Sequence, residues 1–329
     1  MVKNKKAILI TGGAGFIGSH LAEKLLHQGE EVFVIDDLST GSFKNIEHLI
    51  NDKNFHFIKG TVLNSKNVEK LVKKVEQIYH LAAAVGVKTI IDKPLESFLI
   101  NIKGTEIVLE AAAQYGAPVL IASTSEVYGK NSRVPFSEES DRIYGSAYHN
   151  RWGYAVSKGA DEFLGLAYCR ERGLPTVIVR LFNVIGPRQT GAYGMVVPRF
   201  VQQALAGKPI TIYGDGRQTR CFACVCDVTD ALIKLMNQPK AAGNIFNLGS
   251  DEEITIKDLA QKVKSMTGSQ SKITFIPYGK VYGQDFDDMA RRKPDLSKIK
   301  KFIGYEPKVS LGESLKRIIE YYSKLSNAK

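Results

Sequence analysis

The stretch "ILITGGAGFIGSHLAEKLL", residues 8–26, decides the fold, because an apolar run passes through a glycine-rich turn into a helical pattern. Gly12, Gly15 and Gly18 follow the spacing G-x-x-G-x-x-G. A tight turn needs a residue that tolerates positive φ, and a phosphate approaches the backbone closely only where no Cβ intervenes. The N-terminus of the following helix offers free N–H groups and a partial positive charge. The stretch therefore predicts a turn that binds the pyrophosphate of a dinucleotide.

The next apolar run, "EVFVIDD" at residues 31–37, supplies the acid that such a turn needs. It places Asp36 at the end of a predicted strand, 18 residues after Gly18. A carboxylate there accepts hydrogen bonds from the ribose hydroxyls of adenosine and repels a 2′-phosphate. The sequence therefore predicts NAD rather than NADP as the cofactor.

Further strands and helices alternate along the first half of the chain. This alternation predicts an α/β fold, a Rossmann-type doubly wound parallel sheet covered on both faces. Besides residues 31–37, the predicted strands are residues 6–11, 55–60, 77–82, 118–124 and 176–183, and the predicted helices are residues 16–29, 67–75 and 101–116.

From about residue 182 the pattern loosens into a loop at 183–194, a helix at 196–207 and a strand at 210–214. This predicts a second, smaller α/β domain that shares segments with the first. We expect residues 1–181 plus 217–249 to form the NAD-binding domain, and residues 182–216 plus 250–329 to form the substrate-binding domain.

The bulk composition is ordinary for a globular protein of 329 residues, with 44% hydrophobic and 24% charged residues. No apolar run reaches the roughly 18 residues of a membrane span. The N-terminal apolar run is also shorter than the roughly 7–15 residues of a signal peptide, so we expect a cytoplasmic protein. The net charge of +11 is spread along the chain, which favours a solvated surface, or a field for an anionic small molecule, over nucleic-acid binding.

Three of the four cysteines fall in "CFACVCDV", residues 221–228, and the fourth is Cys169. The C-x-x-C pair Cys221 and Cys224 is compatible with zinc or redox chemistry. However, no second Cys/His pair supplies the four ligands of a closed zinc site. The stretch is also typical of an apolar strand, in which unpaired cysteine behaves as a small hydrophobe. We expect structural cysteines and no metal site.

Tyr154 and Lys158 are four residues apart in "RWGYAVSKGADEF", residues 151–163. On a helix, residues i and i+4 share a face. An ammonium group beside a phenol favours the phenolate and lowers its pKa, so the pair predicts a tyrosine base.

At this point the sequence resembles the extended short-chain dehydrogenases/reductases, in the group of nucleotide-sugar epimerases, dehydratases and decarboxylases. The resemblance covers essentially the whole chain. It rests on the motifs "TGGAGFIG", "YHLAA", "STSEVYG", "YAVSK", "RLFNVIGPRQ", "GDGRQTRCF" and "RRKPDLSKIKKFIGYEP". One departure is Gly60-Thr61, where the family often has Gly-Asp near the adenine.

The resemblance implies a tightly held NAD that first oxidises the sugar at C4. Tyr154 would take the C4 hydroxyl proton, Lys158 would hold the ribose and keep Tyr154 acidic, and Thr124 would bind O4. The implied cofactor-binding residues are Gly12, Gly15, Phe16, Ile17, Gly18, Asp36, Leu81, Ala82, Ala83, Tyr154 and Lys158. The implied contacts with the substrate, a UDP-sugar, are Asn183, Arg188, Arg220 and Arg292.

Two positions distinguish the reactions of the group. The chain has Thr124-Ser125-Glu126, as UDP-glucuronate decarboxylases do, where 4,6-dehydratases have Thr-Asp-Glu and simple 4-epimerases lack the glutamate. Arg292 aligns close to the sugar C6, and a guanidinium pairs with carboxylates bidentately. The implied function is UDP-glucuronate (hexuronate) decarboxylation, with catalytic residues Tyr154, Lys158, Thr124, Ser125, Glu126 and Arg292.

Other interpretations remain open from the sequence. Glu126 would also suit a turn cap, and Arg292 a phosphate contact. A UDP-sugar 4-epimerase is the main alternative, ahead of a 4,6-dehydratase or a non-catalytic NAD-binding scaffold. Relatives pair through helices equivalent to those expected at residues 101–115 and 150–172, so the resemblance also implies a homodimer.

Overall fold

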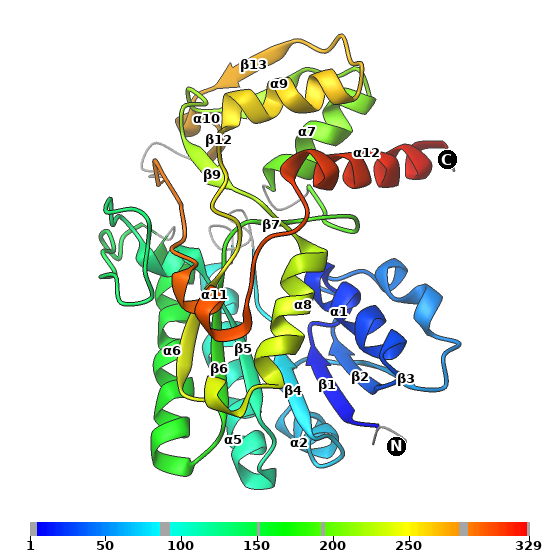
Figure 1. Cartoon of the computed structure of the whole chain (residues 1–329), viewed down its shortest axis with the longest axis vertical. Coiled ribbons are helices and arrows are strands. Elements are labelled where there is room, and N and C mark those ends of the chain that lie inside the picture. The colour runs from blue at the N-terminus through cyan, green and yellow to red at the C-terminus, as the bar shows by residue number, and fades with distance from the viewer. Residues whose placement is uncertain (1–4, 86–92, 150–151, 192–194, 283–288, 328–329) are drawn as a thin grey trace.

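The computed structural model describes residues 5–85, 93–149, 152–191, 195–282 and 289–327, so the last three residues of the predicted loop 183–194 lie outside it. A seven-stranded sheet forms the lower body of the molecule (Figure 1). All its strands are parallel, in the order β11-β6-β5-β4-β1-β2-β3. These strands are β1 (Ala7–Thr11), β2 (Glu31–Asp36), β3 (Phe55–Lys59), β4 (Gln77–His80), β5 (Val119–Thr124), β6 (Thr176–Leu181) and β11 (Asn244–Leu248).

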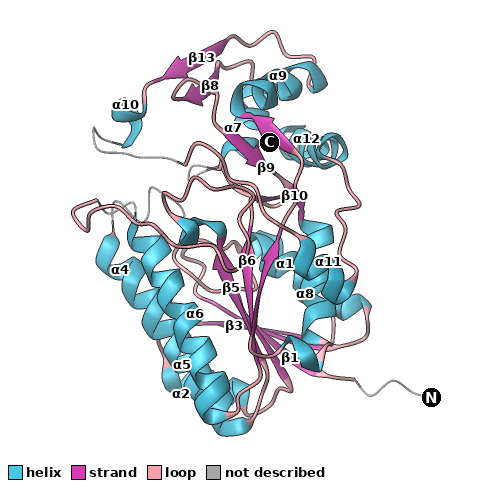
Figure 2. Ribbon diagram, turned by 60° about the vertical axis from the view of Figure 1, so that its left-hand side comes forward, coloured by secondary structure: helices cyan, strands magenta, loops and turns pink. Residues whose placement is uncertain are grey.

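Helices cover both faces of this sheet, which is why its central strands are apolar on both sides. Figure 2 shows α2, α5 and α6 on one face and α1, α8 and α11 on the other. The first set is α2 (Ser65–Val72), α5 (Gly104–Tyr115) and α6 (Gly153–Arg172), and the second is α1 (Phe16–His27), α8 (Val225–Met236) and α11 (Ser297–Ile303). The predicted fold class, a doubly wound Rossmann-type α/β sheet, is confirmed.

The helix that leads into α5 contains a wider turn. The run begins as α4 (Pro94–Phe98), passes through one π-helical turn at Leu99–Lys103 and continues as α5. Asn101 lies in this turn, accepts a hydrogen bond from the Ala84 N–H at 2.8 Å and donates one to Ser157 Oγ at 3.1 Å. The π-helical turn therefore ties the segment after β4 to α6.

A second group of elements lies above the sheet in Figure 1. It has its own apolar core, which includes Phe200, Leu259 and Ile318. Its members are β7 (Val184–Ile185), α7 (Val196–Leu205), β8 (Ile210–Tyr213), β9 (Thr219–Cys221), β10 (Ala223–Cys224), β12 (Glu253–Thr255), α9 (Ile256–Met266), β13 (Ile273–Ile276), α10 (Tyr278–Tyr282) and α12 (Leu311–Asn327).

The predicted strand at residues 221–228 is only partly correct. β9 ends at Cys221 and β10 at Cys224, and α8 begins at Val225, because the apolar residues from there on recur at helical spacing against α1. Cys224 and Cys226 are also joined by a disulfide, so the expectation of unpaired cysteines fails for these two. It holds for Cys221, which is buried, and Cys169.

The described part of the chain holds neither a membrane-spanning helix nor a metal-ligand cluster. No helix there is both long and apolar enough to span a bilayer. No group of three or more His, Cys, Asp or Glu in those residues is arranged to hold a metal ion.

Candidate active site

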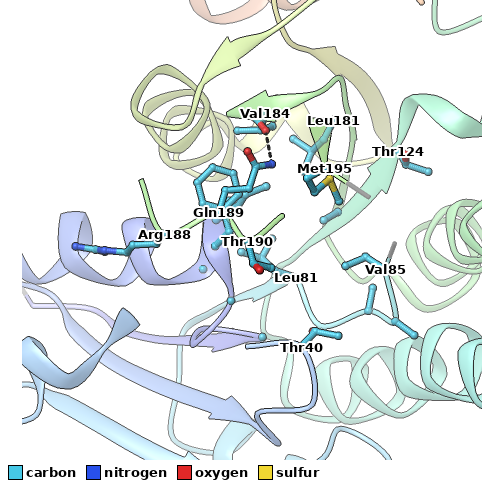
Figure 3. A pocket seen from close by; sticks show the side chains of 18 of the residues that line it. Thr40, Leu81, Val85, Thr124, Leu181, Val184, Arg188, Gln189, Thr190 and Met195 are labelled. Atoms are coloured by element: carbon cyan, nitrogen blue, oxygen red, sulfur yellow. Dashed lines mark hydrogen bonds between the residues drawn. The ribbon is translucent and has the colours of Figure 1, made fainter. Parts of the chain in front are cut away.

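A cleft of about 1630 Å³ opens along the carboxyl ends of the sheet strands. Open parallel sheets place their ligands at this edge, where the strand order reverses between β1 and β4. The wall of the cleft opposite the sheet comes from β7, α7, α12 and the segments around β8 and β9. Figure 3 shows side chains from both walls converging on it, among them Thr124 from β5 and Met195 next to α7.

The glycine turn forms one end of the cleft and fits the pyrophosphate of a dinucleotide. Gly12 has φ +73°, and a Cβ there would lie 2.8 Å from the backbone nitrogen of Ala82. A Cβ on Gly18 would collide with the carbonyl oxygen of Gly12. Both positions therefore require glycine, and the N-terminus of α1 faces the cleft without obstruction.

Asp36 lies at the end of β2, where the sequence predicts the ribose contact. Its carboxylate accepts hydrogen bonds from the backbone N–H groups of Ala14 at 3.0 Å and Leu38 at 2.8 Å. Burial nevertheless raises the pKa of Asp36. The two backbone contacts fix the orientation of the carboxylate and leave lone pairs for ribose hydroxyls.

The reactive groups lie where β5 ends and α6 begins. Tyr154 hydrogen-bonds to Thr124, whose Oγ1 also accepts the N–H of Glu126 at 3.2 Å. Burial raises the pKa of Tyr154, and the negative charge of Glu126 acts in the same direction. The phenol and the Thr124 hydroxyl are therefore set to hold the same substrate oxygen.

Lys158 differs from the prediction. Its Nζ lies 2.7 Å from Asp161 Oδ2, both side chains are buried, and Lys158 does not line the cleft. The expected lowering of the Tyr154 pKa is absent, because Asp161 compensates the ammonium charge and burial of the phenol dominates. Sequence reasoning missed Asp161, although it stands three residues after Lys158 on the same helix face.

Arg292 and Glu126 meet in the cleft wall. Arg292 Nη1 lies 3.7 Å from Glu126 Oε1, and the exposed fractions of the two side chains are 9% and 16%. The two residues are far apart in the sequence, and the structure brings both to the position beside Thr124 and Tyr154. A cation and an acid thus adjoin the phenol.

The predicted substrate contacts Asn183, Arg188 and Arg220 line the cleft, but they also have internal partners. Asn183 donates to the carbonyl of Cys221 at 3.0 Å, and Arg220 to that of Met289 at 2.8 Å. Arg188 has φ +68° and lies 2.7 Å from Glu23 of α1. Figure 3 shows its side chain directed along α1, so it faces the cofactor end of the cleft more than the middle.

The remaining predicted residues are also cleft-lining. These are Gly15, Phe16, Ile17, Leu81, Ala82, Ala83 and Ser125. Thr61, which departs from the family pattern, lines the cleft beside Gly60.

Sequence reasoning missed an aromatic and polar group on the wall opposite the sheet. The guanidinium of Arg199 lies 3.6 Å from the ring centroid of Tyr213, and Gln218 donates to the Tyr278 hydroxyl at 2.9 Å. All four residues line the cleft. The one available signal was an arginine within the otherwise apolar helix pattern of residues 196–207.

A second missed feature is a buried ionic network behind β5. Glu162 on α6 receives two hydrogen bonds at 2.9 Å from the guanidinium of Arg180 and one at 2.5 Å from Ser123, and it also pairs with Arg142. The network holds α6, and with it Tyr154, against the end of the sheet.

Comparison with known proteins decides the family. The family model described as GDP-mannose 4,6 dehydratase matches residues 9–318, which include the glycine turn, Tyr154 and Arg292. The chain belongs to this family. It is an enzyme of the extended short-chain dehydrogenase/reductase type, as the sequence predicts.

Curated relatives resemble the chain over almost its full length. A UDP-N-acetyl-alpha-D-glucosaminuronate decarboxylase of Bacillus cytotoxicus is 43% identical over 98% of this chain and 99% of its own. UDP-glucuronic acid decarboxylase 1 of Danio rerio is 40% identical over 98% of this chain and 74% of its own. These relatives share one reaction type, decarboxylation of a nucleotide-linked uronic acid.

A solved structure supports the same architecture. The UDP-glucuronic acid 4-epimerase of Bacillus cereus, in complex with UDP-glucuronic acid and NAD, superposes with a TM-score of 0.87 at 32% identity. The match covers 97% of this chain and 99% of that one. The fold that carries decarboxylation in some relatives therefore carries C4 inversion in another.

Proposed function

We propose that the chain is an NAD-dependent decarboxylase of a UDP-hexuronate, with UDP-glucuronate as the first substrate to test. The observation that carries this proposal is the Arg292–Glu126 pair beside Tyr154 and Thr124. A guanidinium that lines the cleft beside the phenol provides a bidentate site for the C6 carboxylate of a hexuronate. The decarboxylase relatives support the same choice.

The glycine turn and Asp36 fit NAD, which when bound would accept a hydride from C4 of the sugar. The cofactor-binding residues that we propose are Gly12, Gly15, Phe16, Ile17, Gly18, Asp36, Leu81, Ala82, Ala83, Tyr154 and Lys158. Tyr154 removes the proton of the C4 hydroxyl as the ketone forms, and Thr124 holds O4 in place. Lys158, whose Nζ pairs with Asp161 at 2.7 Å, is the proposed contact to the nicotinamide ribose.

Decarboxylation then follows from the new ketone. A C4 ketone lies β to the C6 carboxylate, so the C5–C6 bond breaks, CO2 leaves and the bonding electrons move onto O4 as an enolate. Thr124 and Tyr154 donate hydrogen bonds to that oxygen. Arg292 orients the carboxylate until it departs, and Glu126, which adjoins Tyr154, takes up a proton from solvent and passes it to C5.

The other predicted residues keep supporting roles in the proposal. Asn183, Arg188 and Arg220 bind the diphosphate side of the substrate. Ser125 stands where 4,6-dehydratases carry an aspartate, so the chain lacks the acid pair that removal of water needs.

In the deciding experiment, the purified enzyme and NAD are incubated with one UDP-sugar at a time. The three sugars are UDP-glucuronate, UDP-N-acetylglucosaminuronate and UDP-glucose. We expect CO2 and a UDP-pentose or UDP-4-keto-pentose from a uronate, and no reaction with UDP-glucose. Uronate inversion without loss of mass would replace the proposal with a 4-epimerase, which the Bacillus cereus structure favours. If the uronates neither release CO2 nor invert at C4, the decarboxylase and the 4-epimerase are both excluded.

Tyr154→Phe tests the base within this assay. Removing a general acid–base group costs about 10²–10⁴-fold in kcat, and the variant should still bind UDP-glucuronate because the ring remains. Val156→Ala, on the exposed side of the same helix, is the control. Wild-type activity in the tyrosine variant would show that Tyr154 is not the base, whereas a wild-type protein without activity on any substrate would leave a non-catalytic NAD-binding scaffold.

We also propose that two copies pair through α6 and the helical run from α4 into α5. Leu95, Leu99 and Phe163 are 72%, 46% and 66% exposed, an apolar group on neighbouring helices. A Phe163→Glu variant should halve the mass measured by light scattering, while Glu171→Gln on the same helix should not change it. A monomeric wild-type protein would exclude the dimer.

The division into domains remains a proposal as well, with residues 1–181 plus 217–249 binding NAD and residues 182–216 plus 250–329 binding the UDP-sugar. Separate apolar cores in the sheet body and above it support this division. A cytoplasmic location also remains a proposal, and cell fractionation tests it.

A further inference from the structure

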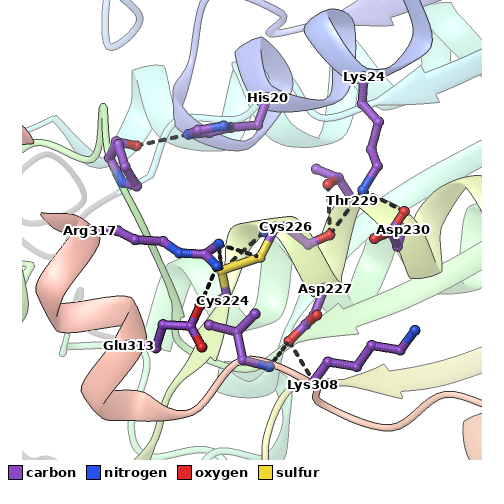
Figure 4. The surroundings of a disulfide bond; sticks show 12 residues. His20, Lys24, Cys224, Cys226, Asp227, Thr229, Asp230, Lys308, Glu313 and Arg317 are labelled. Carbon is purple, nitrogen blue, oxygen red and sulfur yellow. Dashed lines mark hydrogen bonds and ion pairs between the residues drawn. A yellow bond between two sulfur atoms is a disulfide. The ribbon is translucent and has the colours of Figure 1, made fainter. Parts of the chain in front are cut away.

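The disulfide between Cys224 and Cys226 lies outside the machinery described above. It joins the end of β10 to the first turn of α8, with one residue between the cysteines. Figure 4 shows it between α8 and the side chain of Arg317 on α12. Neither sulfur-bearing residue lines the cleft.

The two sulfurs differ in access. Cys224 is 3% exposed, whereas Cys226 is partly exposed. An incoming thiol therefore reaches Cys226 Sγ first. Attack there makes Cys224 the leaving group, since exchange breaks the bond to the sulfur opposite the one attacked.

The surroundings stabilise negative charge on both sulfurs. Arg317 Nη1 lies 3.5 Å from Cys226 Sγ and 4.0 Å from Cys224 Sγ. The backbone N–H of Cys226 donates to Cys224 Sγ at 3.4 Å, at the N-terminus of the 12-residue helix α8. A guanidinium and a helix N-terminus are the features that stabilise cysteine thiolates in reactive sites. Glu313 also pairs with Arg317 and keeps its guanidinium near the sulfurs.

We propose that Cys224 and Cys226 form a thiol–disulfide exchange site that takes low-molecular-weight thiols. A thiolate attacks Cys226 Sγ, the Cys224–Cys226 bond breaks, and Cys224 leaves as a thiolate held by Arg317 and the Cys226 N–H. A second thiolate attacks the outer sulfur of the mixed disulfide and releases Cys226 as a thiolate. The protein gains two electrons, and two small thiols become one small disulfide. The reverse reaction with that small disulfide restores the bond.

Cys221 provides an internal comparison. It lies three residues before Cys224 but is fully buried, and burial raises the pKa of its thiol to about 12. With that pKa the thiol stays protonated, and its burial makes it inaccessible to reagents. Among the three cysteines of residues 221–226, the Cys224–Cys226 pair should therefore be the reactive one.

Differential alkylation tests the site in the full-length enzyme. Protein equilibrated with oxidised glutathione is blocked with iodoacetamide, reduced, labelled with N-ethylmaleimide and mapped by peptide mass spectrometry. We expect N-ethylmaleimide on Cys224 and Cys226. Iodoacetamide should reach Cys221 only if the protein is denatured first. Protein equilibrated with reduced glutathione should carry iodoacetamide on Cys226. Free thiols at both positions after the oxidising incubation would overturn the proposal.

Arg317→Gln tests the electrostatic part, with Lys316→Gln as the control because the exposed neighbour loses the same charge. We expect reduction of the disulfide by glutathione to slow by about threefold to tenfold in the Arg317 variant, and to stay unchanged in the control. Equal rates in the two variants would remove Arg317 from the mechanism. Unchanged unfolding temperatures would show that both variants remain folded.

Discussion

Two arginine–carboxylate pairs flank the end of β5, and they are built differently. Behind the strand, Glu162 and Arg180 lie 2.9 Å apart, with exposed fractions of 0% and 2%. In front of it, Glu126 and Arg292 lie 3.7 Å apart and keep contact with the cleft. Ser123 bonds to the first pair and Thr124 to the backbone beside the second.

The difference shows how the same two chemical groups serve structure in one place and binding in another. Both carboxylate oxygens of Glu162 already have partners from Arg180, Ser123 and Arg142, so the inner network is saturated. The outer pair, at 3.7 Å, exceeds hydrogen-bond distance, and both of its residues line the cleft, where a substrate carboxylate can approach Arg292. Burial and complete hydrogen bonding keep the inner pair structural. The outer pair lies in the cleft wall, where it can bind a substrate carboxylate.

The largest effect should come from breaking the inner pair. Glu162→Gln leaves Arg180 buried without its charge partner, and such a change costs about 3–5 kcal/mol of folding free energy. Urea unfolding measures the loss, with Glu171→Gln on the exposed end of α6 as the control. A loss below about 1 kcal/mol, the range of surface pairs, would show that the network does not support the fold.

Breaking the outer pair should affect catalysis and leave stability nearly intact. Arg292→Gln removes the carboxylate site, and we expect about 10²-fold lower kcat/KM with UDP-glucuronate, equivalent to about 2.7 kcal/mol. Arg291→Gln is the matched control, because this exposed neighbour pairs only with Glu253 among the described residues. Equal losses in both variants would contradict a specific role for Arg292.

The smallest effect should be a shift in pH dependence. The charge of Glu126 raises the pKa of Tyr154. Tyr154 must be deprotonated to act as a base, so its activity rises with pH through that pKa. Glu126→Gln removes the charge, lowers the pKa and should move this rise to lower pH, by up to about one unit.

The midpoint of the kcat/KM profile reports this shift independently of any loss in overall rate. Exposed Glu139→Gln is the control and should leave the midpoint in place. A midpoint that stays fixed or moves to higher pH in the Glu126 variant would show that its charge does not act on Tyr154.

Local patterns were sufficient to predict much of the site. The glycine turn depends on residues 12–18 and their neighbours, and Tyr154 lies within a single helix, so spacing reveals both. The spacing placed Lys158 on the helix of Tyr154, but the predicted lowering of the Tyr154 pKa was wrong, because burial of the phenol and the ion pair of Lys158 with Asp161 are not visible in spacing. The cysteines at 224 and 226 were predicted to be unpaired, since the bend from β10 into α8 that brings their sulfurs together is not apparent from composition.

The sequence by itself determined the alternating α/β elements, the phosphate-binding turn and the acid at Asp36, because each depends on short-range periodicity and on backbone freedom at glycine. Only the tertiary structure decided how charges pair across long separations. It joined Glu126 to Arg292, enclosed Glu162 with Arg180, and set Arg199 against Tyr213. These contacts depend on burial and on the docking of segments far apart in the chain, and both arise only when the whole chain is packed.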